Sequence, residues 1–510
     1  MPPAPSNHPN AGEPPIRDRG DACPGALRLH AADDGALARV RIPAGVLSAA
    51  QAYALADAAE RLGDSALDIT SRGNLQLRGL DGSCGGELAA VLGAAGLLPA
   101  PRHERIRNVV ASPLSGLDEA GHLDVQPLVR QLDALLCSSE RAASLSGRFL
   151  FALDDGRGDL AGLGADVMLL AEPDGQVRIR LAGGEQGLRV PAHEGARTLL
   201  LAAEAFLDAV DASGTRAWRV RELPPEHAVS AGELARRAAR AGIAARIVTL
   251  GAGAHPGGRA GAASAEGDNP READAVPAFV GTALSATGDA GEVAAMQATG
   301  GEGIAGQTEP AAADDGGAVP AAGPVPGVVL GADTATLCVL APLGRLTVIQ
   351  WRLLADLAGR HGSGELRVTP WRGVVVPHLP VRTAARELHA LAGAGLITDP
   401  ASPWLGVGAC TGRPGCAKAL SDVRADATAM VRATGPGGLP VYWSGCERRC
   451  GHPQGAWVDA VATGDGYDLS VRGARGSRPP ARHGVPTARL ADALLAARGT
   501  SSTDSHRPTK

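Results

Sequence analysis

The chain has 510 residues, a formal net charge of −5 and 45% hydrophobic residues, which is typical of a globular protein of several domains. An acidic chain has no bulk electrostatic attraction for nucleic acid. No stretch reaches the roughly 20 apolar residues that span a bilayer, and no apolar run typical of a secretory signal follows Met1. We therefore expect a cytoplasmic protein without nucleic-acid or membrane partners.

The first hundred residues predict a tail followed by a small α+β unit. Residues 1–20 are expected to be disordered. In the unit over 21–100, Ser48 is placed to cap a helix over 49–62. Two β-rich runs follow, and an Ala-rich helix over 86–96 closes the unit. The order β-α-β-β-α predicts a small α+β sandwich.

A larger α+β domain is expected over 101–249, and a segment of different composition follows it. Residues 250–326 are rich in Ala, Gly, Pro and Asp and contain one aromatic residue, Phe279. Such a composition buries too little apolar surface to offset the entropy of folding. We predict a disordered linker here.

The chain after the linker repeats the pattern of its first hundred residues. Residues 43–73 align without a gap with residues 342–372, and the identities include Pro, Gly, Gln, Asp and Thr positions that an Ala-rich composition does not explain. Thr347 is placed to cap a helix over 348–360. We predict a second copy over 327–399, a further α+β domain over 400–497 and a tail over 498–510.

Four cysteines near the C-terminus form two closely spaced pairs. Cys410 and Cys416 are separated by five residues, and Cys446 and Cys450 are separated by three. Four thiolates complete the ligand set of a 4Fe-4S cluster, and the glycines between the first pair let the backbone bring two sulfurs together. Paired zinc ligands usually have two to four residues between them, so a zinc site fits less well. Unrelated buried thiols are the other alternative.

A C-x5-C and C-x3-C pair at the end of a duplicated α+β chain resembles the sulfite/nitrite reductase superfamily. The resemblance implies an internally duplicated α+β fold, with two ferredoxin-like half domains and two larger α+β domains around a pseudo-twofold axis. It also implies that the 4Fe-4S cluster lies beside a tetrapyrrole, usually siroheme.

Three segments of the N-terminal half resemble macrocycle-binding motifs of this superfamily. ITSRGNLQLRG at 69–79 is similar to a T-x-R-x-x-x-Q segment, RNVVASPLSGLD at 107–118 to an R-N-V segment, and GRFLFALDD at 147–155 to a strand with a basic residue before Phe. The resemblance implies that these segments hold the acidic side chains of the macrocycle. The residues expected to bind substrate are Arg72, Asn74, Gln76, Arg107, Arg148 and Arg372. Leu150 stands where the superfamily has a second basic residue, which disfavours sulfite or nitrite as the substrate.

Other segments are similar to one branch, the precorrin-3B synthase family of aerobic cobalamin biosynthesis. They are the opening at 23–45, C-G-H-P at 450–453 and the segment 466–473. The resemblance implies a monooxygenase that hydroxylates precorrin-3A with O2 and forms a lactone, with electrons from an NADH-linked reductase or a ferredoxin. It also implies a mononuclear non-haem iron. The histidines near the motifs are His30, His103 and His452, but no facial-triad spacing assigns them to that iron, and no catalytic acid or base is identified.

Two other functions stay open at this point. A siroheme-dependent sulfite or nitrite reductase carries the same cluster together with a macrocycle of strong red absorption. A non-catalytic iron–sulfur electron carrier has the cluster and binds no macrocycle. The absorption spectrum of the purified protein and a macrocycle-binding assay separate the three functions.

Overall fold

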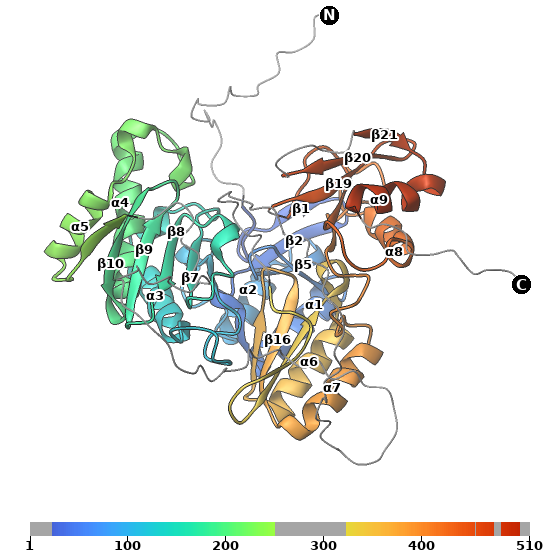
Figure 1. Cartoon of the computed structure of the whole chain (residues 1–510), viewed down its shortest axis with the longest axis horizontal. Coiled ribbons are helices and arrows are strands. Elements are labelled where there is room, and N and C mark those ends of the chain that lie inside the picture. The colour runs from blue at the N-terminus through green and yellow to red at the C-terminus, as the bar shows by residue number, and fades with distance from the viewer. Residues whose placement is uncertain (1–22, 250–322, 454, 474–480, 500–510) are drawn as a thin grey trace, which may run out of the picture.

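The computed structural model describes residues 23–249, 323–453, 455–473 and 481–499 (Figure 1). The predicted tail over 1–20, residues 250–322 of the predicted linker and residues 500–510 lie outside these ranges. Arg498, which we predicted as the first residue of the C-terminal tail, instead ends a helix. Arg498 is buried. Its guanidinium is satisfied there, because it donates to the carbonyl oxygens of Leu439 at 3.0 Å and Thr434 at 3.2 Å. No helix in the described ranges is long and apolar enough to cross a bilayer.

In the described part of the chain, two five-stranded sheets form the centre of the molecule, one for each copy of the repeat. Their strand orders are β1-β2-β5-β4-β14 and β12-β13-β16-β15-β3. The first half domain contributes β1 (His30–Ala32), β2 (Gly35–Val40), β3 (Val46–Ser48), α1 (Ala49–Leu62), β4 (Ala66–Ile69), β5 (Leu75–Leu80) and α2 (Gly85–Ala94). The second half domain contributes β12 (Gly327–Leu330), β13 (Ala335–Leu340), β14 (Arg345–Thr347), α6 (Val348–His361), β15 (Glu365–Val368), β16 (Gly373–Leu379) and α7 (Val381–Gly393).

Each of these sheets includes one strand from the other copy. β14 pairs antiparallel with β4, where Leu346 lies opposite Leu67. β3 pairs in the same way with β15, where Leu47 lies opposite Leu366. Each exchanged strand leads directly into a helix, α1 or α6, whose first turn is fixed by a capping box. The sequence predicts both helices and their caps, and the exchange is an additional finding.

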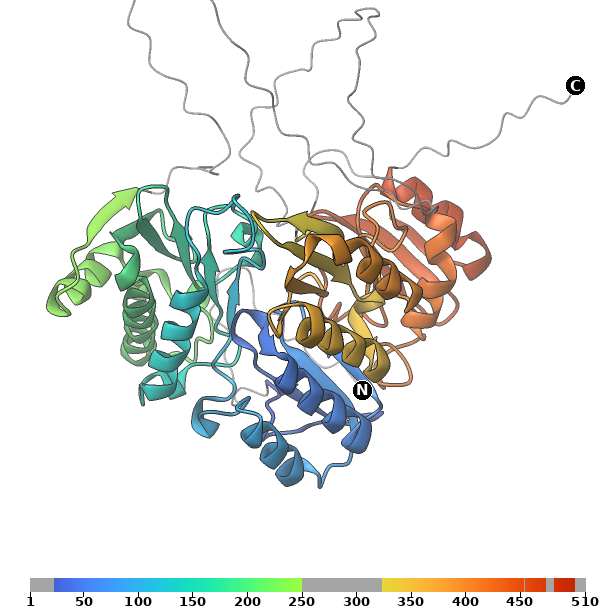
Figure 2. The same cartoon turned by 90° about the horizontal axis from the view of Figure 1, so that it is seen from below.

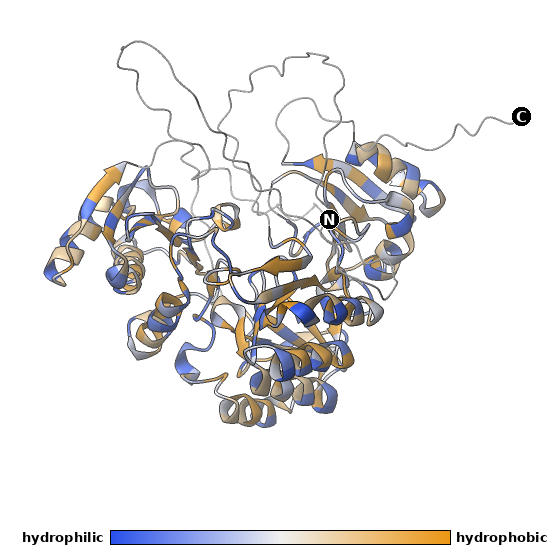
Figure 3. Cartoon of the chain, turned by 60° about the horizontal axis from the view of Figure 1, so that its bottom comes forward, coloured by the Kyte–Doolittle hydropathy of each residue, from blue (hydrophilic) through white to orange (hydrophobic). Residues whose placement is uncertain are grey.

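The two half domains share one hydrophobic core. Buried side chains of both copies form a single cluster between the sheets and the helices, and Figure 3 shows the hydrophobic strands flanked by helices of mixed hydropathy. The helices α1 and α6 pack against each other, and the Trp351 indole N–H donates to the carbonyl oxygen of Ala52 at 2.8 Å. Because the core is shared, neither copy has a complete core of its own.

Each copy is followed by a larger α+β domain, and the two have the same sheet plan. In both sheets the first three strands are parallel and the later strands antiparallel. The N-terminal α+β domain contains β6 (Val109–Ala111), α3 (Gln126–Ser138), β7 (Phe151–Asp154), β8 (Val167–Ala171), β9 (Gln176–Leu181), β10 (Gln186–Pro191), α4 (Gly195–Ser213), α5 (Ala231–Arg240) and β11 (Arg246–Thr249). The C-terminal α+β domain contains β17 (Val407–Ala409), α8 (Val423–Thr434), β18 (Val441–Ser444), β19 (Trp457–Ala462), β20 (Tyr467–Arg472), β21 (Arg482–Val485) and α9 (Leu490–Arg498).

Each α+β domain contacts the half domain of the other copy. Arg367, on β15 of the second half domain, donates to the carbonyl oxygens of Pro113 at 2.9 Å and Ser115 at 2.8 Å. Arg424, on α8 of the C-terminal α+β domain, pairs with Asp68 of the first half domain at 3.0 Å. Figure 2 shows the two half domains between the two α+β domains. The crossed contacts place the loops that follow β6 and β17 next to the central sheets.

Candidate functional site

The four predicted cluster cysteines lie in two loops at one edge of the C-terminal sheet. Cys410 directly follows β17, and the second pair follows β18. These strands are parallel neighbours, so their carboxyl ends meet at the same edge of the sheet. The Cys410 amide donates to the carbonyl oxygen of Trp443 at 2.9 Å, and the Gly445 amide donates to the Cys410 sulfur at 3.1 Å. The pairing of β17 with β18 therefore brings the two cysteine pairs together.

The four thiols form one electrostatic group. Burial raises the pKa of the Cys450 thiol, and the other three cysteines of the set raise it further. Arg448 opposes this rise. Because a raised pKa disfavours the thiolate, a bound cation is needed to hold Cys450 in its ionised form beside the other three cysteines.

Neighbouring side chains fix both cysteine loops. Between the cysteines of the second pair, Arg449 has a φ of 48° and pairs with the buried Asp459 at 2.6 Å. In the first loop, Arg78 of β5 donates to the carbonyl oxygen of Gly415 at 2.9 Å, next to Cys416. The Asp33 carboxylate accepts from the amide of the residue after Cys416. The first half domain thus holds the first cysteine loop in place.

The donor set fits a cluster better than a single ion. Within the described ranges, no three His, Cys, Asp or Glu side chains stand close enough together to hold one metal ion. A 4Fe-4S cube has iron at four corners, so its thiolate ligands stand farther apart than the ligands of one ion. The chemistry of four neighbouring thiols, one of which accepts a hydrogen bond from the Gly445 backbone amide, is compatible with such a cluster. The four cysteines therefore lie in adjacent loops, and their role as ligands of a 4Fe-4S cluster stays a prediction.

A second set of predicted site residues lies on the face of the first half domain's sheet that points away from its helices. Along β2 and β5, Ala38, Val40 and Leu77 enter the shared core. The residues between them point to the opposite face because side chains alternate along a strand. That face carries Arg39, Arg41, Gln76 and Arg78, and Arg39 lies opposite Gln76 in the register. We call it the arginine face.

At the end of this face near the N-terminal α+β domain, further arginines gather around Gly147. The Gly147 carbonyl oxygen accepts from Arg41 at 3.2 Å and from Arg72 at 3.5 Å. The Arg148 guanidinium lies 4.8 Å from the centroid of the Trp218 ring. We call the following five residues the arginine cluster: Arg39, Arg41, Arg72, Arg148 and Arg219.

The arginine cluster has little negative charge of its own. Burial, together with the neighbouring arginines, lowers the pKa of Arg41 to about 9 and of Arg72 to about 10, although the nearby Cys23 opposes this fall. Among the described residues, the carboxylate that pairs with a member of the cluster is Asp166, at 2.6 Å from Arg219. The Arg39 guanidinium Nε donates to the neutral amide oxygen of Gln76 at 3.1 Å. Buried cations without counterions are costly, so this site favours an anion.

Two of the predicted substrate-binding residues serve the fold. The Arg107 guanidinium makes a two-pronged pair with Asp133, with both N···O distances at 2.7 Å. Asn74 is buried, accepts from the Ile42 amide at 3.0 Å and donates to Asn108 at 3.0 Å. Their hydrogen-bonding groups are therefore occupied within the protein.

The sixth predicted residue, Arg372, contacts the cysteine loops. Its backbone φ is 64°, and its Nη2 donates to the carbonyl oxygen of Gly451, the residue after Cys450, at 3.3 Å. The guanidinium lies 5.5 Å from the centroid of the Tyr442 ring. The Tyr442 hydroxyl in turn donates to the carbonyl oxygen of Cys450. Arg372 therefore ties the second half domain to the cysteine loops.

The motif comparison missed Arg39, Arg41 and Arg219, although the repeat contains a signal for the first two. When the same register is extended just upstream of the aligned segment, Arg39 and Arg41 correspond to Cys338 and Leu340. In the structure, Cys338 packs in a small apolar cluster with residues of the loop after β6. The first copy thus has two arginines at positions where the second copy has apolar residues. This difference indicates a role for the arginines that only the first copy has.

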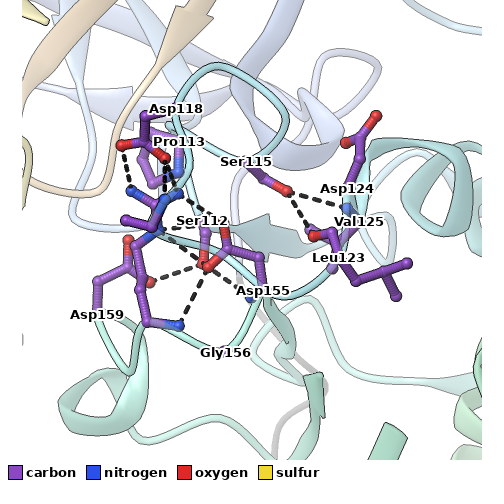
Figure 4. Close-up of polar contacts among 12 residues, drawn as sticks. Ser112, Pro113, Ser115, Asp118, Leu123, Asp124, Val125, Asp155, Gly156 and Asp159 are labelled. Atoms are coloured by element: carbon purple, nitrogen blue, oxygen red, sulfur yellow. Dashed lines mark hydrogen bonds and ion pairs between the residues drawn. The ribbon is translucent and has the colours of Figure 1, made fainter. Parts of the chain in front are cut away.

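The loop after β6 and the first cysteine loop each follow the first strand of the parallel set in their domain. Figure 4 shows the polar contacts of the loop after β6. Its Ser112, which directly follows the strand as Cys410 does, donates to Asp159 at 2.7 Å. Arg157 pairs with Asp118 and Asp155, both at 2.7 Å. Ion pairs and hydroxyl hydrogen bonds hold this loop.

The mononuclear iron that the resemblance implies has no ligand set within the described ranges. The buried His103 has its Nε2 2.9 Å from the carbonyl oxygen of Ser139. His452 stacks on Trp457 with ring centroids 5.0 Å apart, and His30 is exposed on β1. The structure gives these three histidines no shared site.

Comparisons with known proteins agree with this architecture. Residues 30–94 and 331–392 match the family model described as the nitrite/sulfite reductase ferredoxin-like half domain. The chain is 28% identical to a ferredoxin–nitrite reductase of Synechococcus elongatus, covering 82% of this chain and 74% of that protein. It is 26% identical to a precorrin-3B synthase of Sinorhizobium sp., covering 91% and 85%. The solved structure of the Mycobacterium tuberculosis NirA protein has the same fold, with a TM-score of 0.62 at 17% identity over 92% of this chain and 82% of that one. The predicted fold class is confirmed.

Proposed function

Because two segments of the chain match the nitrite/sulfite reductase half-domain model and the chain shares the fold of the NirA protein, we propose that it is an oxidoreductase of the sulfite/nitrite reductase type that acts on a tetrapyrrole. The macrocycle binds at the arginine face, and a 4Fe-4S cluster is held by Cys410, Cys416, Cys446 and Cys450. The substrate is precorrin-3A, and the reaction is the O2-dependent hydroxylation and lactone formation of a precorrin-3B synthase. The electron donor is an NADH-linked reductase or a ferredoxin.

The observation that carries the proposal is the shortage of negative charge in the arginine cluster. Its five guanidiniums are paired with one carboxylate among the described residues, and burial lowers the pKa of three of them. A ligand with several carboxylates supplies the missing countercharge through two-pronged hydrogen bonds. A modified uroporphyrinogen is such a ligand, because carboxylates surround its rim.

The arginine face also supports a ligand that reaches from the arginine cluster to the cysteine loops. In the register of β2 with β5, Arg41 and Arg78 are offset by four residues along the strand direction. At the usual rise per residue of a strand, this offset is about 13 Å. Arg41 contacts Gly147 at one end, and Arg78 contacts Gly415 at the other. A flat macrocycle on this face has its carboxylates near the arginine cluster and one edge toward the cysteine loops. Arg78 pairs with Asp34 at 2.8 Å and supports the first of these loops.

Each group has a separate task in this proposal. The cluster, when bound, supplies single electrons. Arg72 and Arg148 bind carboxylates of the macrocycle, and Arg372 keeps the cysteine loops against the second half domain. Holding the substrate rigidly in this way places the carbon to be hydroxylated in one orientation.

Leu150 favours an organic substrate over a small anion. Its side chain is 2% exposed and packs with Ala152, Met168 and Trp371 in an apolar cluster on the N-terminal sheet. The resemblance implies a basic residue here in enzymes that reduce sulfite or nitrite. An apolar group excludes water and offers no charge to a small anion.

A siroheme-dependent nitrite reductase is the second candidate, and the 28% identity to the Synechococcus elongatus enzyme favours it. Protein purified without oxygen separates the two candidates. Strong red absorption from bound siroheme supports the reductase, whereas the broad, weak absorption of an iron–sulfur cube alone supports the monooxygenase.

The proposed reaction is tested by incubating the reduced full chain with precorrin-3A and ¹⁸O-labelled O2. We expect one labelled oxygen atom in the product, detected as a mass increase of the tetrapyrrole. Unchanged precorrin-3A, together with nitrite or sulfite turnover by the same preparation, would overturn the proposal in favour of the reductase.

A further inference from the structure

A buried hydroxyl without a partner lies at the end of strand β18. Ser444 is 0% exposed, and its Oγ has no hydrogen-bond partner among the described residues. A buried hydroxyl in a folded protein is normally paired, because leaving it unpaired costs free energy. The position therefore indicates a partner that the protein chain itself does not supply.

The alternation of side chains along β18 shows which way Ser444 points. Val441 and Trp443 enter the core under the helices of the C-terminal α+β domain. Tyr442 and Ser444 consequently lie on the opposite face of the sheet. On that face the Tyr442 hydroxyl reaches the carbonyl oxygen of Cys450, so Ser444 shares its face with the second cysteine loop.

The residue after Ser444 already touches the cluster ligands. The Gly445 amide donates to the Cys410 sulfur at 3.1 Å. A Cβ at Gly445 would lie 2.6 Å from the Ala419 side chain, so the two cysteine loops pass each other closely here. Ser444 stands between a backbone donor to Cys410 and the first ligand of the second pair, Cys446.

We propose that Ser444 is a positioning residue that would donate a hydrogen bond from its hydroxyl to an inorganic sulfide of the cluster and thereby raise the cluster's reduction potential. The inference rests on the proposed function, since it requires the cluster. Reduction adds negative charge to an anionic cluster, and a hydrogen-bond donor stabilises the reduced state more than the oxidised one.

A neighbouring buried oxygen that also has no hydrogen-bond partner within the described ranges, on Asp459, cannot donate a hydrogen bond to the cluster. Asp459, across from Tyr442 in the register, is fully buried, and one of its oxygens has no partner among the described residues. Its other oxygen holds Arg449 and Arg472. A carboxylate accepts hydrogen bonds and repels negative charge, so it cannot stabilise a reduced cluster. Ser444 is the donor of the two.

The test is a reductive titration of the full chain, purified without oxygen and followed by electron paramagnetic resonance. We expect the reduction potential of Ser444→Ala to be lower than that of the wild type, and Ser444→Thr, which keeps the hydroxyl, to stay near the wild-type value. Ser112→Ala, which removes an equally buried serine from the other α+β domain, should leave the potential unchanged. A wild-type potential in Ser444→Ala overturns the proposal.

A second pair of variants covers the case in which Ser444→Ala loses its cluster. Ser444→Thr and Ser444→Val have nearly the same shape and differ by the hydroxyl, so their potentials should differ in the same direction. Equal reduction potentials in Ser444→Thr and Ser444→Val would contradict the proposed hydrogen bond and leave the proposed function intact. A wild-type chain without a 4Fe-4S signal instead overturns the proposed function and this inference with it.

Discussion

At the scale of single residues, the molecule separates arginines that are paired with carboxylates from arginines that gather with few carboxylates around them. Arg107 and Arg72 both lie in segments that resemble macrocycle-binding motifs. Arg107 pairs with Asp133 through two hydrogen bonds, whereas Arg72 reaches a carbonyl oxygen and is surrounded by other arginines. The same residue type in similar motifs therefore has different tasks.

Replacing Arg72 with alanine should weaken macrocycle binding. We expect the Kd for precorrin-3A to rise about tenfold to a hundredfold, because one charge-assisted hydrogen-bonding group to a carboxylate is lost. Fluorescence or absorption titration of the reduced tetrapyrrole measures this. Arg61→Ala, on the exposed side of the same half domain, is the matched control and should bind normally. Equal affinity in both variants would remove Arg72 from the site.

Replacing Arg107 with alanine should instead destabilise the protein. The change leaves the largely buried Asp133 carboxylate without its ion-pair partner. Removing one partner of such a pair costs about 3 kcal/mol in the free energy of unfolding. Chemical denaturation measures the free energy of unfolding. A variant with normal stability and weakened macrocycle binding would return Arg107 to the role that its motif implies.

Asp159 should make stability depend on pH in the N-terminal α+β domain. Burial raises the pKa of its carboxyl to about 7, and the nearby Asp154 adds to the rise. Because the pKa is higher in the folded than in the unfolded state, the folded state binds the proton more tightly, and stability falls as the pH rises from about 4 to about 7. Asp159→Asn should flatten this part of the stability profile. An unchanged profile would contradict the assignment.

At the scale of elements, the exchange of β3 and β14 joins the two copies. Leu346, in the middle of β14, is fully buried opposite Leu67 in the sheet of the other copy. The helices that follow the exchanged strands pack against each other. Neither sheet is complete without the partner strand, so the half domains should unfold as one unit.

Leu346→Ala tests this coupling. We expect a loss of about 2–5 kcal/mol in the free energy of unfolding, with circular dichroism and tryptophan fluorescence reporting one common transition for both half domains. Ile349→Ala, three residues later and 80% exposed, should change stability by no more than about 0.5 kcal/mol. Two separate transitions in the wild type would show that the copies fold independently.

Much of this architecture follows from the sequence because its signals are local. The capping residues Ser48 and Thr347 and the alternating strands predict the half-domain elements, and the gap-free repeat predicts their duplication. The exchange does not follow, since β3 and β14 are three residues long and their pairing partners are set by packing across the whole molecule. The arginine face also depends on strand register, which places Arg39 opposite Gln76.

At the scale of the whole molecule, a pseudo-symmetric frame carries one asymmetric site. The arginine face exists in the first copy, and its counterpart in the second copy is covered by an apolar contact around Cys338 and Val375. The cysteine loops belong to the C-terminal α+β domain, and the equivalent N-terminal loop is held by ion pairs around Arg157. Crossed docking brings the arginine face of one half to the cysteine loop of the other through Arg78 and Gly415.

The most direct test of this account is the electron paramagnetic resonance spectrum of the full chain, purified and reduced without oxygen, together with its iron content. We predict the signal of a reduced 4Fe-4S cluster with about four iron atoms per chain. Cys446→Ser should abolish this signal, and Cys137→Ser, on α3 of the other α+β domain, should retain it. A wild-type chain that holds one zinc ion, or a Cys446→Ser variant with an unchanged spectrum, would contradict the account.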